Sequence, residues 1–97
     1  MNTFSEDKFI DIAELFRIFG DSTRVKIIYT LLDGELCVGE IANRTNATQS
    51  AVSHQLRILK DSKLVKYKKK GKEIYYFLAD DHVEKIFRMG CEHVDEV

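Results

Sequence analysis

The sequence predicts a mainly helical domain that carries one β-hairpin. Apolar residues recur at helical spacing between Cys37 and Leu64, and apolar and polar residues alternate between Leu64 and Leu78. The chain has 97 residues and no proline, which fits one small, mostly helical domain over residues 1–97. The core of such a domain is modest, so we expect a second copy of the chain to help stabilise it.

Two helices are predicted ahead of this central stretch. The first follows Ser5, a good N-cap residue, and ends at Gly20. Its apolar residues cover more than one side of the helix, so we expect it to contact both its own core and a second subunit. The second helix begins at Asp21 or Ser22 and ends at residues 33–34, an Asp-Gly pair typical of a helix end.

Residues 37–64 predict two further helices joined by a tight turn. Asn46 falls in the turn and tolerates the left-handed backbone that such a turn needs. Thr48 is a good N-cap for the second of these helices. One stripe of that helix is apolar, with Val52, Leu56 and Leu59. The residues off the stripe are polar, namely Gln49, Ser50, Ser53, His54 and Arg57. This division suits a recognition helix in a DNA major groove, although an ordinary amphipathic hairpin would show it too.

The alternation from Leu64 to Leu78, with Gly71 in the middle to turn the chain, predicts a β-hairpin. Five lysines gather near its tip, namely Lys66, Lys68, Lys69, Lys70 and Lys72. Their mutual repulsion is unfavourable, and contact with DNA phosphates would explain their number. Two helices joined by a turn and followed by a basic hairpin make a winged helix-turn-helix.

Charge is distributed unevenly along a chain whose net charge is only −1. Between His54 and Lys72, eight basic side chains accompany one acidic side chain, which gives a local net charge of +7. From Asp80 to Val97, six acidic side chains accompany two basic ones, which gives −4. The basic middle implies a polyanion as partner, and the acidic end would suit a cation.

Several classes of protein are excluded by what the sequence lacks. It contains no apolar run long enough to span a membrane and no signal-peptide pattern, so we expect a cytoplasmic protein. Its two cysteines, Cys37 and Cys91, give no disulfide framework. It has no glycine-rich phosphate loop, no recognisable pair of nucleophile and base, and no open three-ligand metal motif, so we do not expect an enzyme.

The last predicted helix starts at Asp80 or Asp81 and carries two histidines. His82 and His93 are eleven residues apart, so they point within about 20° of each other but lie roughly 16 Å apart along the axis. Each has a carboxylate nearby, Asp80 for His82 and Glu96 for His93. Two antiparallel copies of this helix would bring together two N₂O₂ sites suited to Zn²⁺. A solvated helix with two incidental histidines would give the same pattern.

The sequence resembles the ArsR/SmtB family of metal-responsive repressors over nearly its whole length. The matching segments are GDSTRVKIIYTLL, ELCVGEIA, QSAVSHQLRILKDSKLV, KKKGKEIYYFL, and a terminal D-x-H followed by H-x-x-E. The resemblance implies a homodimer of winged helices that binds operator DNA in the metal-free state and releases it when metal binds. It also implies zinc ligands at Asp80, His82, His93 and Glu96, with Asp80 preferred over Asp81 by its spacing.

The chain departs from the family at one known metal site. Members that sense arsenite, cadmium or lead carry a thiolate pair where this chain has only Cys37, with Gly39 in the second position. One thiolate is a poor site for a soft metal, so Cys37 is expected to be a small buried residue. Cys91 lies about 200° around the helix from His93, so we expect it to pack rather than bind metal.

We therefore expect a zinc-responsive repressor. Gln49, Ser50, Ser53, His54 and Arg57 would read bases, and the hairpin lysines would hold phosphates. The alternative signals are Co²⁺, Ni²⁺ or oxidation of a cysteine. The alternative functions are a winged-helix protein-interaction module and a zinc buffer that does not bind DNA.

Overall fold

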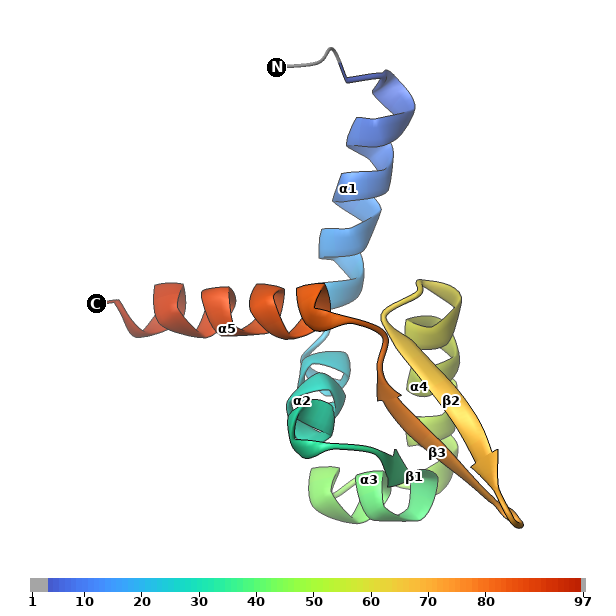
Figure 1. Ribbon diagram of the computed structural model, residues 1–97. Coiled ribbons are helices and arrows are strands. Elements are labelled where there is room, and N and C mark those ends of the chain that lie inside the picture. The colour runs from blue at the N-terminus through green and yellow to red at the C-terminus, as the bar shows by residue number, and fades with distance from the viewer. Residues whose placement is uncertain (1–3, 97) are drawn as a thin grey trace.

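The computed structural model describes residues 4–96, which form five α-helices, a short 3₁₀ helix and three strands (Figure 1). In chain order they are α1 (Glu6–Phe19), α2 (Ser22–Thr30), η1 (Leu31–Asp33), β1 (Leu36–Cys37), α3 (Val38–Thr45), α4 (Gln49–Asp61), β2 (Val65–Lys70), β3 (Glu73–Leu78) and α5 (Asp81–Asp95). The predicted combination of helices with a hairpin wing is confirmed. Within residues 4–96, no helix has both the length and the hydrophobicity needed to cross a membrane.

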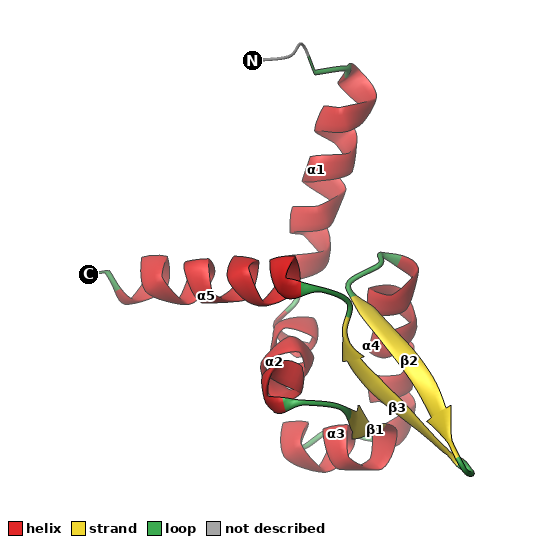
Figure 2. Ribbon diagram, viewed as in Figure 1, coloured by secondary structure: helices red, strands yellow, loops and turns green. Residues whose placement is uncertain are grey.

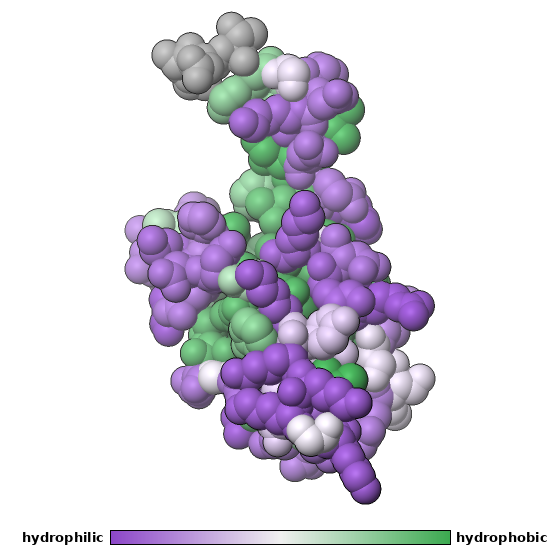
Figure 3. Space-filling model, turned by 45° about the vertical axis from the view of Figure 1, so that its right-hand side comes forward, coloured by the Kyte–Doolittle hydropathy of each residue, from purple (hydrophilic) through white to green (hydrophobic). Residues whose placement is uncertain are grey.

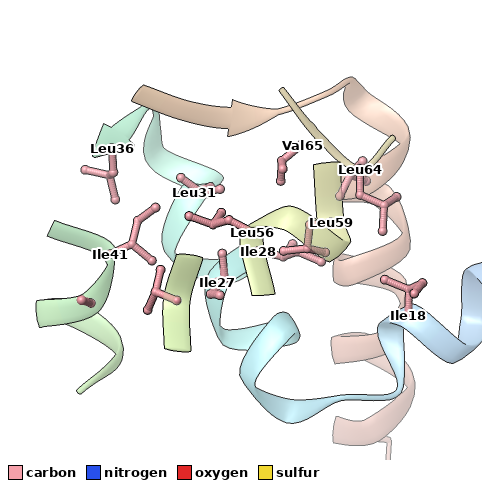
Figure 4. Close-up of a cluster of buried hydrophobic side chains, with 13 residues drawn as sticks. Ile18, Ile27, Ile28, Leu31, Leu36, Ile41, Leu56, Leu59, Leu64 and Val65 are labelled. Carbon is pink, nitrogen blue, oxygen red and sulfur yellow. The ribbon is translucent and has the colours of Figure 1, made fainter. Parts of the chain in front are cut away.

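The core lies between α2, α3, α4 and the base of the hairpin (Figure 4). Ile27 and Ile28 of α2 meet Leu56 and Leu59 of α4 there, and all four side chains are fully buried. The predicted apolar stripe of α4 is thus the side that packs on the body. By contrast, α1 and α5 extend away from the body in different directions (Figures 1 and 2).

Four of the helices begin at residues whose side chains cap them. Ser5, Asp21, Thr48 and Asp80 each accept a hydrogen bond from a backbone N–H two or three residues further on. Such a bond satisfies one of the free donors in the first helical turn. The structure thereby selects Asp21 over Ser22 as the cap of α2.

Residues with positive φ turn the chain before α4, after α4 and at the tip of the hairpin. Asn46 (φ 55°) and Gly71 (φ 62°) do so at the predicted turns. Lys63 (φ 65°) was not predicted. It ends α4 and lets the N–H of Leu64 donate to the C=O of Leu59, at 2.9 Å. This bond closes the helix in a Schellman arrangement, and β2 begins at the next residue.

The sheet is antiparallel with strand order β1-β3-β2, so β3 is central. Its register pairs Leu36 with Tyr76, and Lys68 with Tyr75. The sequence did not predict β1, which is only two residues long. Pairing with β1 fixes the hairpin to the body and brings the residue before it, Glu35, next to the wing.

A buried guanidinium connects three helices. Arg24 of α2 donates from Nε to the C=O of Ile18 in α1, at 2.8 Å, and from a terminal nitrogen to Oε1 of Gln55 in α4, at 3.0 Å. Only 9% of Arg24 is exposed. Because a buried charge needs such partners, Arg24 fixes the end of α1 relative to α4.

Candidate functional site

The polar face of α4 is available to a ligand. All five residues predicted to read bases are exposed, namely Gln49, Ser50, Ser53, His54 and Arg57. They lie on one helix and face away from the core because Val52, Leu56 and Leu59, on the other side, are fully buried. The helix is also held at both ends, by the Thr48 cap and the Lys63 turn. The chain thus presents a rigid polar helix surface.

The wing lysines are exposed but do not form one uniform group. The register puts Lys66, Lys68 and Lys70 on one face of the hairpin and Lys69 on the other, while Lys72 lies in the turn. Figure 3 shows a broad hydrophilic surface where the wing comes forward. This surface and the exposed face of α4 belong to consecutive elements joined by a tight turn.

Two of these lysines are engaged by an acid that sequence reasoning missed. Lys68 Nζ lies 2.6 Å from Oε2 of Glu35, and Lys70 Nζ pairs with Oε1 of the same residue. Hydrogen bonds from the Lys68 and Lys70 ammonium groups lower the pKa of the Glu35 carboxyl. The link joins residues more than thirty positions apart, and only the pairing of β1 with β3 reveals it.

A histidine and a carboxylate stand together at each end of α5. At the start, Asp80 Oδ1 accepts the backbone N–H of His82 at 2.9 Å and lies 3.4 Å from His82 Nδ1. At the end, Glu96 Oε2 lies 3.8 Å from His93 Nδ1. Asp81 is the first residue of the helix, and the contact to His82 belongs to Asp80. The structure thus pairs the predicted ligands two by two.

Both pairs have the spacing that a shared zinc ion requires. Two ligands on one tetrahedral zinc, each bonded at about 2.1 Å, lie roughly 3.4 Å apart. The nitrogen–oxygen distances of 3.4 Å and 3.8 Å are close to that value. All four side chains are more than half exposed, so each pair is open to an ion from solvent. The residues present therefore fit a zinc ion.

One protomer supplies only half of such a site. Within residues 4–96, no three His, Cys, Asp or Glu side chains lie close enough together to hold a metal ion. The histidines of the two pairs are eleven positions apart along the helix, a distance of about 16 Å. Each pair offers two ligands, and a four-coordinate site needs two more.

The second pair borders an apolar groove of about 1000 Å³ between α1 and α5. Its apolar lining includes Phe16 from α1 and Met89 and Val94 from α5, which are 58%, 66% and 75% exposed. His93 and Glu96 lie on its border. Figure 3 shows apolar surface along α1 as well. Such a concentration of exposed apolar side chains marks an interaction surface.

The cysteines differ from expectation. Cys37 is half-buried rather than buried, because it precedes α3 at the surface, and its Sγ lies 3.5 Å from Glu40 Oε1. Cys91 is exposed in the groove, so the prediction that it packs is wrong within the protomer. The reason is that α5 has left the body by then, since Val83 is its only fully buried residue among those described.

Comparisons with known proteins agree with this architecture. Residues 21–67 match the family model described as bacterial regulatory protein, arsR family. The cadmium resistance transcriptional regulatory protein CadC homolog of Staphylococcus aureus is 44% identical over 89 residues, covering 91% of this chain and 74% of that protein. The transcriptional repressor SmtB homolog of Synechocystis is 41% identical over 92 residues, covering 95% and 70%.

A solved structure matches over almost the whole chain. It is the homodimeric winged helix-turn-helix DNA-binding domain of a possible ArsR-family transcriptional regulator from Mycobacterium bovis. Its TM-score is 0.86 at 26% identity, covering 99% of this chain and 92% of that one. The relatives confirm the resemblance seen in the sequence, and they are regulators rather than enzymes. The chain belongs to the ArsR/SmtB family of transcriptional regulators.

Proposed function

We propose that this chain is a cytoplasmic repressor that binds operator DNA as a homodimer and releases it when zinc binds. The observation that carries the proposal is the placement of two half-sites on α5. Each end of the helix offers one imidazole and one carboxylate at ligand spacing, and the second of these pairs borders an uncovered apolar groove. A second copy of the chain that covers the groove would complete both half-sites.

The dimer follows from the uncovered surfaces of α1 and α5. Four large apolar residues of α1 are between 39% and 58% exposed, namely Phe9, Ile10, Ile12 and Phe16. Leaving them in water is unfavourable, and burying them against a second copy would stabilise both chains. The similar domain from Mycobacterium bovis is homodimeric.

With the two α5 helices antiparallel, Asp80 and His82 of one protomer would meet His93 and Glu96 of the partner subunit. A bound zinc ion would supply a rigid four-coordinate link between the helices. Each histidine would keep its second ring nitrogen free to donate to a backbone carbonyl. By symmetry there are two such sites in each dimer.

The donor set favours zinc over softer metals. Imidazole and carboxylate suit zinc, whereas cadmium prefers thiolates. The name of the Staphylococcus aureus relative refers to cadmium resistance. In this chain, however, Cys37 stands beside Glu40 instead of a second thiol, and Cys91 lies apart from the histidine pairs. Cobalt can use the same four ligands, and nickel would need more.

DNA binding would use α4 and the wing together. Gln49, Ser50, Ser53, His54 and Arg57 would reach base edges in the major groove, while the wing lysines would contact phosphates. The net charge of +7 between His54 and Lys72 favours this use over a protein-interaction module or a zinc buffer.

The packing of α5 provides a link from metal to DNA. Val83 is buried in the core, and the Phe87 ring lies 5.9 Å from the ring of Tyr29 in α2. Because α2 also packs on α3 and α4, an imposed angle between two α5 helices would change the spacing of the two recognition helices. A thousandfold loss of affinity requires about 4 kcal/mol of coupling.

The test compares DNA binding with and without metal. An operator is first selected from random DNA with metal-free protein, and its release is then measured with Zn²⁺, Co²⁺ and Ni²⁺. We expect His93→Ala to bind DNA like wild type without metal and to be insensitive to zinc. Asp95→Ala, beside the site on the same helix, should respond like wild type. Zinc release that survives in His93→Ala would refute the site.

A mixed dimer tests whether the ligands come from two chains. A chain with His82→Ala still offers His93 and Glu96, and a chain with His93→Ala still offers Asp80 and His82. We expect the heterodimer to bind one zinc ion tightly, the wild type two, and each mutant homodimer none. Absence of a tight site in the heterodimer would rule out sharing between subunits.

A further inference from the structure

The wing contains a second electrostatic feature, formed by Glu35, Lys68 and Lys70. Glu35 precedes β1, which pairs with the central strand β3, while both lysines lie on β2 at the far side of β3. The two lysines nevertheless reach Glu35, and each takes one oxygen of the carboxylate, Lys68 at 2.6 Å from Oε2 and Lys70 at Oε1. The pairing therefore crosses the width of the sheet.

The lysine side chains reach Glu35 by lying over aromatic rings of β3. Lys68 Nζ is 5.6 Å from the ring centroid of Phe77, and Lys70 Nζ is 5.2 Å from that of Tyr75. A cation over an aromatic face is attracted to it, and the apolar stem of lysine covers the ring. The carboxylate and the rings together keep these two side chains against the sheet instead of extended into solvent.

This cluster remains accessible to a competing anion. The Lys68 and Lys70 side chains are 49% and 52% exposed, and that of Glu35 is 27% exposed. The pairs are thus near the surface, where an ion pair contributes little and exchanges readily. A DNA phosphate offers the same lysines a similar anionic oxygen.

We infer that Glu35 acts as an internal substitute for DNA phosphate, which engages Lys68 and Lys70 when DNA is absent and lowers the affinity of the wing for nucleic acid of any sequence. The inference rests on the proposed DNA binding. It gives Glu35 a role in discrimination between operator and random DNA. When the wing binds phosphates more weakly, the base contacts of α4 contribute a larger share of the total binding free energy. The carboxylate also relieves repulsion between the lysines in the free protein.

The experiment is Glu35→Gln, which keeps the shape and removes the charge. Affinity for operator and for random DNA should both rise, by roughly 2- to 10-fold for two exposed pairs. The plot of log affinity against log salt should become steeper by up to about 0.9 for each lysine released to phosphate. Glu73→Gln is the matched control, because Glu73 is exposed on the same wing opposite Lys70 in register. Among the described residues, it has no basic group within ion-pair distance. Its effect should be smaller, without a change in slope.

A double variant of the wing tests whether the effect of Glu35 acts through the two lysines. When Lys68→Gln and Lys70→Gln are already present, Glu35→Gln should have no more effect than Glu73→Gln, since contacting residues are not additive. The inference is overturned if Glu35→Gln binds no more tightly than Glu73→Gln, or binds more weakly because the cluster orients the wing for DNA. Wild-type protein that shows no salt-dependent binding to any DNA would instead overturn the proposed function.

Discussion

α4 and α5 are amphipathic helices of similar length, 13 and 15 residues, yet they relate differently to the rest of the chain. In α4, three apolar residues are fully buried by the same protomer. In α5, Val83 alone reaches that condition, while Met89 and Val94 stay exposed. The apolar side of α4 packs against the same chain, whereas most of the apolar side of α5 is uncovered in the protomer. The position of α4 is therefore fixed by folding, and that of α5 is fixed by assembly of two chains, which a ligand can influence.

The largest effect is expected where α4 meets the core. Leu56→Ala should lower the free energy of unfolding by about 2–5 kcal/mol, because it removes a fully buried side chain and leaves a cavity. Urea unfolding followed by circular dichroism would measure it. His54→Ala, on the exposed side of the same helix, should change stability by less than about 0.5 kcal/mol. Equal effects would mean that α4 is not seated as described.

On the helices that extend from the body, α1 and α5, an introduced charge should weaken dimerisation. Phe16→Asp places a carboxylate on the uncovered face of α1, so it should weaken the proposed dimer by at least about 2 kcal/mol. Sedimentation would show monomers at concentrations where wild type is dimeric. Ile74→Asp on the wing, where the native residue is 41% exposed, should leave the dimer intact. A dimeric Phe16→Asp would place the interface elsewhere.

Two caps of similar chemistry sharpen the comparison. Thr48→Ala removes the cap of α4 and should cost about 1 kcal/mol of global stability. Ser5→Ala removes the cap of α1, where only Ile18 is buried, so it should mainly fray the first turn. Amide hydrogen exchange distinguishes the outcomes, because Ser5→Ala should accelerate exchange near Lys8 alone. Global acceleration by Ser5→Ala would show that α1 is as strongly coupled to the fold as α4.

The smallest effect concerns an ion pair on α1. A hydrogen bond from Arg17 lowers the pKa of Glu14 from its ordinary value of 4.5. Such a group contributes stability above that value and loses the contribution as the pH falls through its lowered pKa. Because both side chains are exposed, Glu14→Gln should leave the thermal midpoint unchanged at pH 7. A clear drop at pH 7 that disappears in acid would reveal a buried environment for this pair, such as a dimer contact.

Structural features that depend on a few adjacent residues could be predicted from the sequence. The caps at Ser5 and Thr48, the turn at Asn46 and the hairpin around Gly71 each depend on a few adjacent residues, and the structure has them where expected. β1 could not be predicted, because two residues carry no periodicity. Lys63 could not either, since its left-handed backbone reflects the closure of α4 and no preference of lysine.

The candidate sites also differ in whether they depend on local or on distant residues. Asp80 with His82, and His93 with Glu96, are local pairs, so their spacing follows from helix geometry and capping. The engagement of Glu35 with the wing depends on strand pairing across more than thirty residues, and no sequence pattern indicates it. The same distinction explains Cys91, whose exposure depends on where α5 leaves the body.

The turn at Lys63 has a mechanical consequence. Because β2 begins at the residue directly after Leu64, whose N–H closes α4, no flexible linker allows the helix and the wing to move independently. A further backbone bond holds the same junction: Ala79, the residue after β3, donates its N–H to the C=O of Leu64 at 3.0 Å. α4 and the wing therefore move as one rigid body. When this body tilts on a DNA duplex, α4 should leave the major groove at the same time as the wing leaves the phosphate backbone. Release from DNA should therefore be abrupt instead of graded.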